Sequence, residues 1–325
     1  MTAPVLEIHL SDSDAADALH HDVRVGLSAD PKWLPPKWFY DARGSELFEQ
    51  ITTLPEYYPT RTERELLRRS ADEIAGWAPV DTLVELGSGS SDKTRLLLDA
   101  LTASGSLQRF VPLDVSESAL RGAMAAVARE YPGLAVHGVV GDFTRHLELL
   151  PAGQGGRRLV AFLGGTIGNL LPDERARFLS ALHAALDPGE LVLLGVGLVT
   201  DPAVMVPAYD DVAGVTAEFN RNVLHVLNRE LGADFDVAAF DHVAVWDAAH
   251  EWIEMRLRAC RPMTVRLPVV GMTAHFAKGE EMCTEVSGKF GRDGLSSGLD
   301  SAGFDLVHWW TDPAERFALS LAIRR

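Results

Sequence analysis

The chain has 325 residues, which is room for one large domain or two smaller ones. Its 46 acidic residues outnumber its 30 basic residues, and the formal net charge of −16 disfavours a nucleic-acid partner because phosphates are repelled. Hydrophobic residues make up 47% of the sequence, so intrinsic disorder is excluded as a description of the whole chain.

The cysteine content and the N-terminal segment indicate the compartment. Cys260 and Cys283 are too few for a disulfide framework or a four-cysteine zinc site. The N-terminus is acidic without the apolar core of a secretory signal, and no stretch reaches the ~18 apolar residues of a membrane helix. We therefore expect a cytoplasmic protein without a membrane partner.

The first 60 residues contain six prolines, and we expect them to pack as irregular structure against a later part of the chain. A capping box, Thr62-Glu-Arg-Glu65, then predicts the start of a helix. From there short apolar runs alternate with segments of helical spacing. The runs predict strands at 82–87, 109–115, 134–140, 158–164 and 191–196, and the spacing predicts helices at 92–103, 116–131 and 172–186.

Strands that are apolar throughout and separated by helices indicate a parallel sheet covered on both faces. The sequence therefore predicts an α/β fold with a doubly wound, mostly parallel, Rossmann-like sheet.

After residue 198 strands and helices no longer alternate, and the pattern becomes typical of an α+β domain. It predicts a helix at 214–231, a β-hairpin of 242–246 and 252–258, and a strand at 263–270. A helix at 292–302 and strands at 306–310 and 317–323 return to the α/β pattern. An insertion of roughly 90 residues, the size of a small domain, explains this change. We expect one domain of 62–197 plus 290–325, and a substrate-binding domain of 1–61 plus 198–289.

A glycine loop follows the first expected strand, in the segment Glu85-Leu-Gly-Ser-Gly. Glycines let the backbone turn tightly and approach a ligand, and the helix that follows favours an electron-rich group. A dinucleotide fingerprint needs a third glycine where this chain has Asp92. An acid at the position facing a pyrophosphate argues against an NAD-dependent oxidoreductase.

Acidic residues end the next two strands. Asp114 can accept both hydroxyls of a ribose, while Asp142 and Phe143 can bond the amine of an adenine and stack on its ring. Glycines after strand one and acids after strands two and three form the pattern of class I S-adenosylmethionine (SAM) methyltransferases. A carboxylate-rich pocket suits the cationic sulfonium and ammonium groups of SAM.

Seven segments together resemble the histidine Nα-methyltransferases of ergothioneine biosynthesis: 34–41, 54–61, 84–89, 162–169, 209–211, 219–222 and 284–290. The resemblance covers nearly the whole chain after the first 20 residues. It implies an enzyme that uses SAM to place three methyl groups on the α-nitrogen of L-histidine, giving the betaine hercynine. The chain departs from the family at Gly197, where an acid is frequent, and at Gly288, where cysteine is frequent.

The resemblance also implies roles for individual residues. SAM would be held by Gly87, Lys93, Asp114, Asp142 and Phe143. Histidine would be held by Tyr57, Asn169, Tyr209, Glu285 and Ser287, to which we add Gly164, Thr166 and Met255 as substrate neighbours. Tyr40 is our candidate for a catalytic neighbour of the amine, although a tyrosine with an ordinary pKa of about 10 is a weak base.

Other interpretations of these residues stay open. Asn169 could cap the following helix, and Met255 has the spacing of a core residue. Glu285 and Ser287 share a face of an extended segment and could hold an imidazole edge, or that face could be solvated, with Glu281 and Lys289 beside them.

Competing functions differ in substrate or in class. They are Nα-methylation of another aromatic amino acid such as tryptophan, an NAD-dependent oxidoreductase, and a non-catalytic SAM-binding protein. Methyl transfer needs no metal, and the 11 histidines lack metal-ligand spacing. We expect a monomer whose partner is the small molecule L-histidine.

Overall fold

The computed structural model of the protein describes residues 4–77, 79–151 and 155–325. The chain divides into two compact units, which we describe separately: one of Met1–Ser11, Arg61–Leu198 and Phe290–Arg325, the other of Asp12–Thr60 and Val199–Lys289. The expected division differs at the N-terminus. The strand β1 (Val5–Ile8) belongs to the first unit because it pairs in parallel with β5 (Ala135–Val140).

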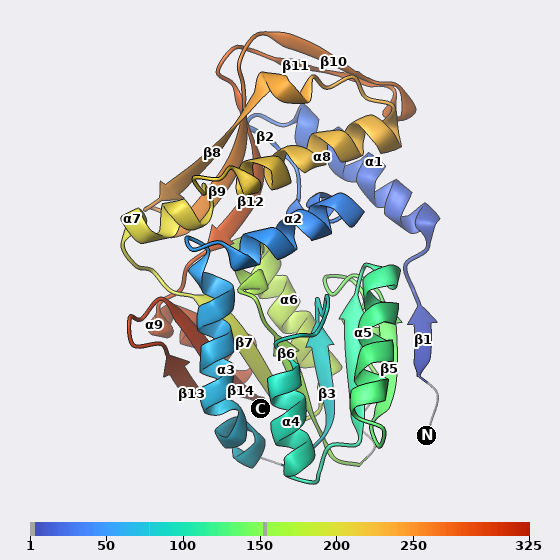
Figure 1. The fold of residues 1–325 in the computed structure, drawn as a ribbon, viewed down its shortest axis with the longest axis vertical. Coiled ribbons are helices and arrows are strands. Elements are labelled where there is room, and N and C mark those ends of the chain that lie inside the picture. Colours follow the sequence, from blue (N-terminus) through green and yellow to red (C-terminus); the bar gives the residue numbers. More distant parts are fainter. Residues whose placement is uncertain (1–3, 78, 152–154) are drawn as a thin grey trace. The chain divides into compact units, whose positions relative to one another are not determined.

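The first unit is built on an eight-stranded sheet in the order β1-β5-β4-β3-β6-β7-β14-β13 (Figure 1). Its other strands are β3 (Val80–Leu86), β4 (Arg109–Asp114), β6 (Arg157–Phe162), β7 (Leu191–Gly197), β13 (Phe304–Thr311) and β14 (Phe317–Arg324). The strands from β1 to β7 in this order run parallel, and β14 and β13 close the sheet as antiparallel strands. The expected doubly wound sheet is confirmed.

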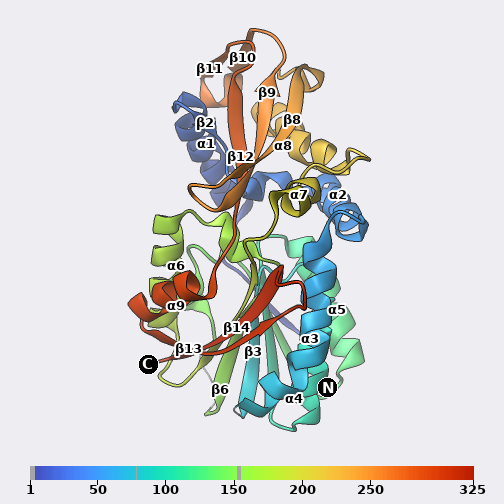
Figure 2. The same cartoon turned by 90° about the vertical axis from the view of Figure 1, so that its left-hand side faces the viewer.

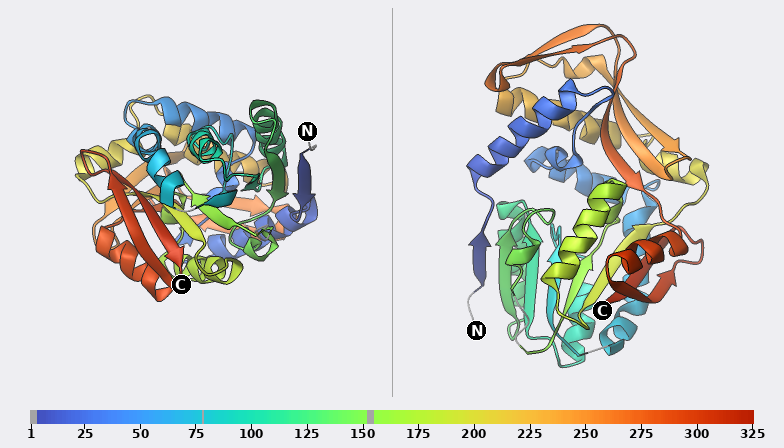
Figure 3. Two further views of the ribbon diagram at one scale, coloured as in Figure 1. Left: turned by 90° about the horizontal axis from the view of Figure 1, so that it is seen from below. Right: turned by 180° about the vertical axis from the view of Figure 1, so that it is seen from behind.

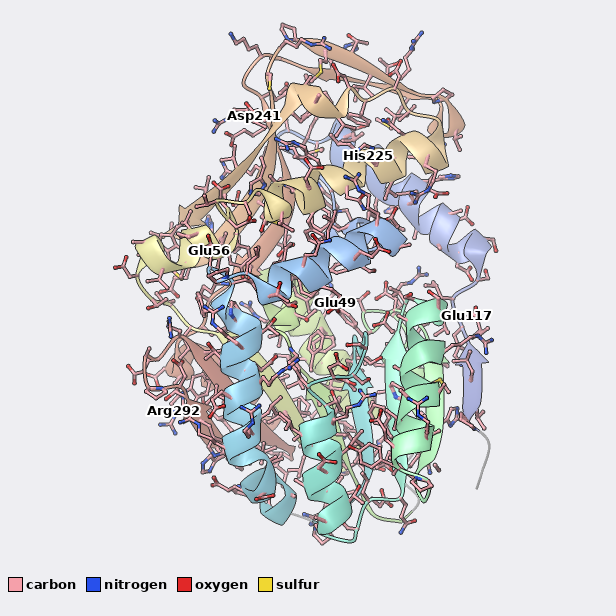
Figure 4. All side chains as sticks on the ribbon, viewed as in Figure 1. Glu49, Glu56, Glu117, His225, Asp241 and Arg292 are labelled. Carbon is pink, nitrogen blue, oxygen red and sulfur yellow. The ribbon has the colours of Figure 1, made fainter. Side chains whose placement is uncertain are left out.

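Both faces of this sheet are covered by helices because its strands are apolar on both sides. On β3, Leu83 packs into one core cluster and Val84 into the other. The first cluster includes α3 (Tyr58–Trp77), α4 (Arg95–Ala103) and α5 (Glu117–Glu130), whose first-turn Glu117 is labelled in Figure 4. The second includes α6 (Pro172–Ala185) and α9 (Arg292–Ser301), which the right-hand view of Figure 3 shows from behind.

The N-terminal 60 residues are not irregular, as the prolines suggested, but mostly helical. Helices α1 (Asp12–Ser28) and α2 (Ala42–Thr53) flank a short segment with β2 (Lys32–Trp33) and the 3₁₀ helix η1 (Pro36–Phe39). Pro59 lies in the first turn of α3, where proline is tolerated because that N–H has no helical partner. Since α3 begins at Tyr58, the expected capping box at Thr62 lies inside the helix.

The second unit contains a four-stranded sheet in the order β2-β12-β9-β8 (Figure 2). The expected hairpin is confirmed as β8 (Phe240–Asp247) and β9 (Trp252–Ala259), and β12 (Glu281–Gly288) pairs with β9. The expected helix is α8 (Val215–Leu231), which follows the short α7 (Pro202–Met205). The strand expected at 263–270 divides into β10 (Met263–Leu267) and the turn η6 (Pro268–Val270), and β11 (Met272–Phe276) returns beside β10. Among the described residues, no helix has the length and apolar character needed to cross a membrane.

Candidate active site

The glycine loop of the first unit lies where β3 ends. Gly87 and Gly89 have φ of 65° and 50°, a left-handed conformation that glycine adopts without steric cost. The backbone N–H groups of Gly87 and Ser88 donate to the Leu113 carbonyl at 2.8 and 3.1 Å. These bonds fix the loop beside the end of β4, at the sheet edge where ligands of open α/β folds bind.

Asp114 holds the loop from the end of β4. Its Oδ2 accepts the Gly89 N–H at 2.9 Å, and its Oδ1 accepts the Ser116 N–H at 2.9 Å. Burial raises the pKa of Asp114, while the backbone N–H groups of Ser116 and Gly89 oppose that shift. Each carboxylate oxygen has further acceptor capacity, so Asp114 can still receive ribose hydroxyls.

Phe143 and Asp142 follow β5 at the same sheet edge. The Phe143 ring packs edge-to-face on Phe162 with centroids 4.9 Å apart. A Cβ atom at Gly87 would lie 3.9 Å from this ring, so the loop and the aromatic side chain are neighbours. Asp142 Oδ1 accepts the backbone N–H and the hydroxyl of Thr144 at 2.8 and 2.6 Å, which fixes the turn.

This edge of the first unit fits SAM. The Ser88 hydroxyl is buried and has no hydrogen-bond partner among the described residues, so a polar group of a ligand can form a hydrogen bond with it. The glycine backbone, the Asp114 carboxylate and the Phe143 ring are the groups that bind a nucleoside with a cationic tail.

Replacing Asp114 with asparagine should weaken SAM binding about tenfold, because a neutral amide replaces the charged acceptor of ribose hydroxyls. Isothermal calorimetry with SAM measures this change. Asp236→Asn is the matched control, because the Asp236 side chain is 52% exposed, pairs with Arg261 and belongs to the other unit. Equal SAM affinities of the two variants would remove Asp114 from the site.

Sequence reasoning missed Glu63, which connects two of the expected site segments within this unit. Its side chain is fully buried, pairs with Lys93 and accepts the Gly164 N–H through Oε1 at 2.7 Å. A Cβ atom at residue 195 would lie 1.9 Å from Glu63 Oε1, so Gly195 leaves the space that this carboxylate occupies. Lys93 is therefore held in place by an ion pair with Glu63, a carboxylate that α3 supplies.

Glu85 belongs to the glycine motif, and its side chain anchors the same loop. Its two oxygens accept the hydroxyls of Ser91, at 2.8 Å, and Thr94. Burial raises the pKa of Glu85 to about 7, against the effect of these two hydroxyls. Ser91 has a φ of 56°, so its side-chain bond to Glu85 stabilises a left-handed residue in the loop.

Gly164, Thr166 and Asn169 follow β6. Gly164 and Gly165 have φ of 80° and 73°, and the Thr166 hydroxyl donates to the Leu163 carbonyl at 2.9 Å. Asn169 ends the 3₁₀ helix η3 (Thr166–Asn169) and is not the cap of α6, because the residue before that helix is Leu171. The capping interpretation of Asn169 is therefore wrong, and its ligand role stays a prediction.

In the second unit, three side chains from two distant segments meet at one point. The hydroxyls of Tyr209 and Ser287 lie 2.7 Å apart, and Lys289 Nζ donates to both, at 2.9 and 2.8 Å. The ammonium also lies 4.8 Å from the centroid of the Tyr209 ring. All three residues are less than 9% exposed. We call these three residues the hydroxyl–lysine cluster.

The surroundings shift the pKa values of two members of this cluster. Burial, and next the charge of Glu285, raise the pKa of Tyr209, which therefore keeps its phenolic hydrogen at neutral pH. Burial lowers the pKa of Lys289 to about 7, with the Glu285 charge acting in the opposite direction. Tyr209 can thus donate a hydrogen bond to a ligand but cannot act as a general base near neutral pH.

Other expected substrate residues lie around this cluster in the same unit. Met255 on β9 pairs with Glu285 on β12 and is 2% exposed, as the core interpretation predicted. The rings of Tyr57 and Tyr209 meet edge-to-face, with centroids 6.3 Å apart. Tyr40 is 42% exposed and packs edge-to-face on Phe48 and Phe219. The structure thus brings the rings of Tyr57 and Tyr209 into contact. The role of Tyr40 stays a prediction.

The interpretation of Glu281 to Lys289 as one solvated face is wrong for its C-terminal half. Ser287 and Lys289 are buried, and the pairing of β12 with β9 shifts register between Cys283 and Glu285. Sequence reasoning therefore missed Lys289 as a site residue. The spacing of Glu285, Ser287 and Lys289 at alternate positions was the available signal, because alternate residues of a strand share a face.

A sheet that is parallel from β1 to β7 and ends in the antiparallel pairs of β14 and β13, with a glycine loop after β3 and an acid ending β4, is typical of class I SAM-dependent methyltransferases. A family model described as histidine-specific methyltransferase, SAM-dependent, matches residues 19–324. The chain belongs to this family. Membership excludes the NAD-dependent oxidoreductase and the non-catalytic binding protein as functions.

Full-length relatives are similar to the chain. It is 57% identical to histidine N-alpha-methyltransferase of Mycolicibacterium smegmatis and 56% identical to that of Mycobacterium tuberculosis, each over 97% of this chain and 98% of the relative. It is 33% identical to ergothioneine biosynthesis protein 1 of Neurospora crassa, over 70% of this chain and 27% of that protein.

Proposed function

We propose that this enzyme transfers methyl groups from SAM to the α-amino group of L-histidine, forming hercynine for ergothioneine biosynthesis. The observation that carries the proposal is the 56–57% identity, over 97% of the chain, to two histidine N-alpha-methyltransferases. The similarity to ergothioneine biosynthesis protein 1 supports the assignment of the product to ergothioneine biosynthesis. We also propose that the protein is a monomer and acts in the cytoplasm.

The second unit supplies the chemistry that an aromatic amino acid needs. We assign the Tyr209 hydroxyl, a donor because of its raised pKa, to the substrate carboxylate. We assign Glu285 and Ser287 to the imidazole nitrogens, with Tyr57 and Met255 as neighbours of the ring. In the first unit, Asn169, Gly164 and Thr166 are the proposed substrate residues, and Gly87, Lys93, Asp114, Asp142 and Phe143 are the proposed SAM residues.

SAM supplies an electrophilic methyl group on a sulfonium. The protein's part is to orient the acceptor amine in its neutral form, because only a lone pair aimed at the methyl carbon can displace the sulfonium. Since Tyr209 keeps its hydrogen, its hydroxyl orients the substrate and does not remove the proton of the amine. Tyr40 remains our candidate for the neighbour of that amine.

The product should carry three methyl groups, because a substrate anchored by its carboxylate and ring leaves the amine able to rotate between transfers. Mass spectrometry of a reaction with excess SAM should show mono- and dimethylated histidine converting to the trimethylated betaine. Histamine, which lacks the carboxylate anchor, is the control substrate and should react poorly. Accumulation of monomethylhistidine as the end product would contradict the proposal.

A further inference from the structure

Lys289 is a buried ammonium whose hydrogen-bond partners are neutral. It is 7% exposed, and in the described part of the chain its side chain bonds to two hydroxyls and forms no ion pair with a carboxylate. Two other ionic side chains inside the protein are directly paired: Glu63 with Lys93, and Glu190 with Arg158. The Glu285 carboxylate acts on Lys289 only from a distance, without a direct bond. A buried ammonium bonded only to neutral hydroxyls is costly, so this site favours an incoming anion.

Counting hydrogens shows what the hydroxyl–lysine cluster can offer a ligand. An ammonium has three N–H groups and no acceptor, so both of its contacts run from Lys289 to the hydroxyl oxygens. The contact of 2.7 Å between Tyr209 and Ser287 uses one of the two hydroxyl hydrogens. One N–H and one hydroxyl hydrogen remain, so the charged cluster is a cationic group with two hydrogens to donate.

We propose that Lys289 is the positioning residue for recognition of the substrate carboxylate: its ammonium holds the Tyr209 hydroxyl hydrogen toward the ligand and supplies the positive charge that selects an anion. This inference rests on the proposed function, since it takes Tyr209 as the carboxylate contact. A carboxylate has two acceptor oxygens and one negative charge, which matches the two hydrogens and single positive charge of the cluster.

The same count assigns the role of Ser287. When Tyr209 gives its hydrogen to the carboxylate, Ser287 must give its own hydrogen to the Tyr209 oxygen to keep their 2.7 Å contact. Ser287 then has an acceptor site left and no hydrogen, so it can bond only a ring nitrogen that carries a hydrogen. With the other ring N–H given to Glu285, this arrangement binds the histidine side chain as its imidazolium. Lys289 therefore couples the recognition of the carboxylate to the recognition of the ring.

Loss of the Lys289 proton should reverse the arrangement. A neutral amine can accept a hydrogen bond, so Tyr209 can then turn its hydrogen toward Lys289 and away from the ligand. The ionisable groups that the structure places beside the cluster in this unit are Glu285 on β12, Tyr57, whose ring packs on Tyr209, and His242, which bonds the Tyr209 carbonyl at 2.8 Å. Burial lowers the pKa of His242, so it stays neutral above pH 7.

The first test compares L-histidine with L-histidinamide, in which a neutral amide replaces the carboxylate. Wild type and Lys289→Met are assayed with both substrates, so intrinsic differences between the substrates cancel. The preference of wild type for L-histidine, as a ratio of kcat/KM values, should fall about tenfold or more in Lys289→Met. The loss should lie mainly in KM, because the carboxylate contact is present in both ground and transition states.

The second test is the pH dependence of KM for L-histidine between pH 6 and 9.5. Binding favours protonated Lys289, so affinity is present below its pKa of about 7 and is lost as pH rises through that value. The ratio of wild-type KM to that of Lys289→Arg should rise with pH, because a guanidinium stays charged. Titration of the substrate itself affects both proteins equally.

Calorimetry with SAM and circular dichroism verify that each variant is folded. The inference is overturned if folded Lys289→Met keeps the wild-type preference for L-histidine, or if the ratio of wild-type KM to that of Lys289→Arg does not rise with pH. Should Lys289→Met fail to fold, the comparison of wild type with Lys289→Arg decides, and parallel pH profiles overturn the inference. A wild-type enzyme that methylates neither substrate refutes the proposed function instead.

Discussion

Replacing Glu285 with alanine should lower kcat/KM for L-histidine by one to two orders of magnitude. Glu285 is the proposed acceptor of an imidazole N–H, directly or through one water. Losing a charge-assisted partner and leaving a buried N–H unpaired costs about 1.5–3 kcal/mol. Glu285 lies on β12 opposite Met255, so the vacated volume should also ease entry of a larger ring. Relative activity on tryptophan should therefore rise.

Steady-state kinetics with both amino acids and calorimetry with SAM measure these effects. Glu285→Gln is the matched control, because its amide oxygen can still accept a hydrogen bond and its volume hardly changes; it should retain more histidine activity than Glu285→Ala. SAM affinity should stay near the wild-type value, since the proposed SAM residues belong to the other unit. Unchanged kcat/KM for histidine, or a parallel loss of SAM binding, would refute the role of Glu285.

Removing Glu190 should cost about 3–5 kcal/mol in the free energy of unfolding, because it leaves the buried Arg158 charge unpaired. Both side chains are 3% exposed, and Arg158 donates to the two oxygens of Glu190 at 2.8 and 2.6 Å. Burial opposes the charged form of Glu190, but the bonds from Arg158 and the Asp187 N–H outweigh it and lower the pKa of this carboxyl.

Urea denaturation of Glu190→Ala at pH 7 measures this loss. Glu130→Ala is the control, since the Glu130–Arg95 pair lies at the surface and should leave the unfolding midpoint near that of wild type. Because the folded pKa of Glu190 is lowered, its stabilisation is present above the ordinary glutamate pKa of about 4.3 and is lost as pH falls further. A Glu190→Ala variant as stable as Glu130→Ala would show that the ion pair adds nothing.

The central sheet could be predicted because its signals are local. Each of its strands after β1 is a short apolar run, and each crossover helix carries its own periodic stripe. The same kind of signal exists in α1, where Leu19, Val23 and Leu27 recur at every fourth position and are buried. The prolines at 31–36 led to the wrong expectation of irregular structure, although they occupy only the segment between α1 and α2.

What the sequence determined by itself was the sheet, the glycine loop and acids at its ligand edge, and the residue types for a methyl donor and an amino acid. The tertiary structure decided which charges are paired. Lys93 meets Glu63 across 30 residues, and Lys289 meets Tyr209 across 80. Periodicity shows which residues share a face but not what lies opposite that face, and a lysine is solvated unless the fold buries it. Only the pairing of distant segments made Lys289 a buried cation beside two hydroxyls.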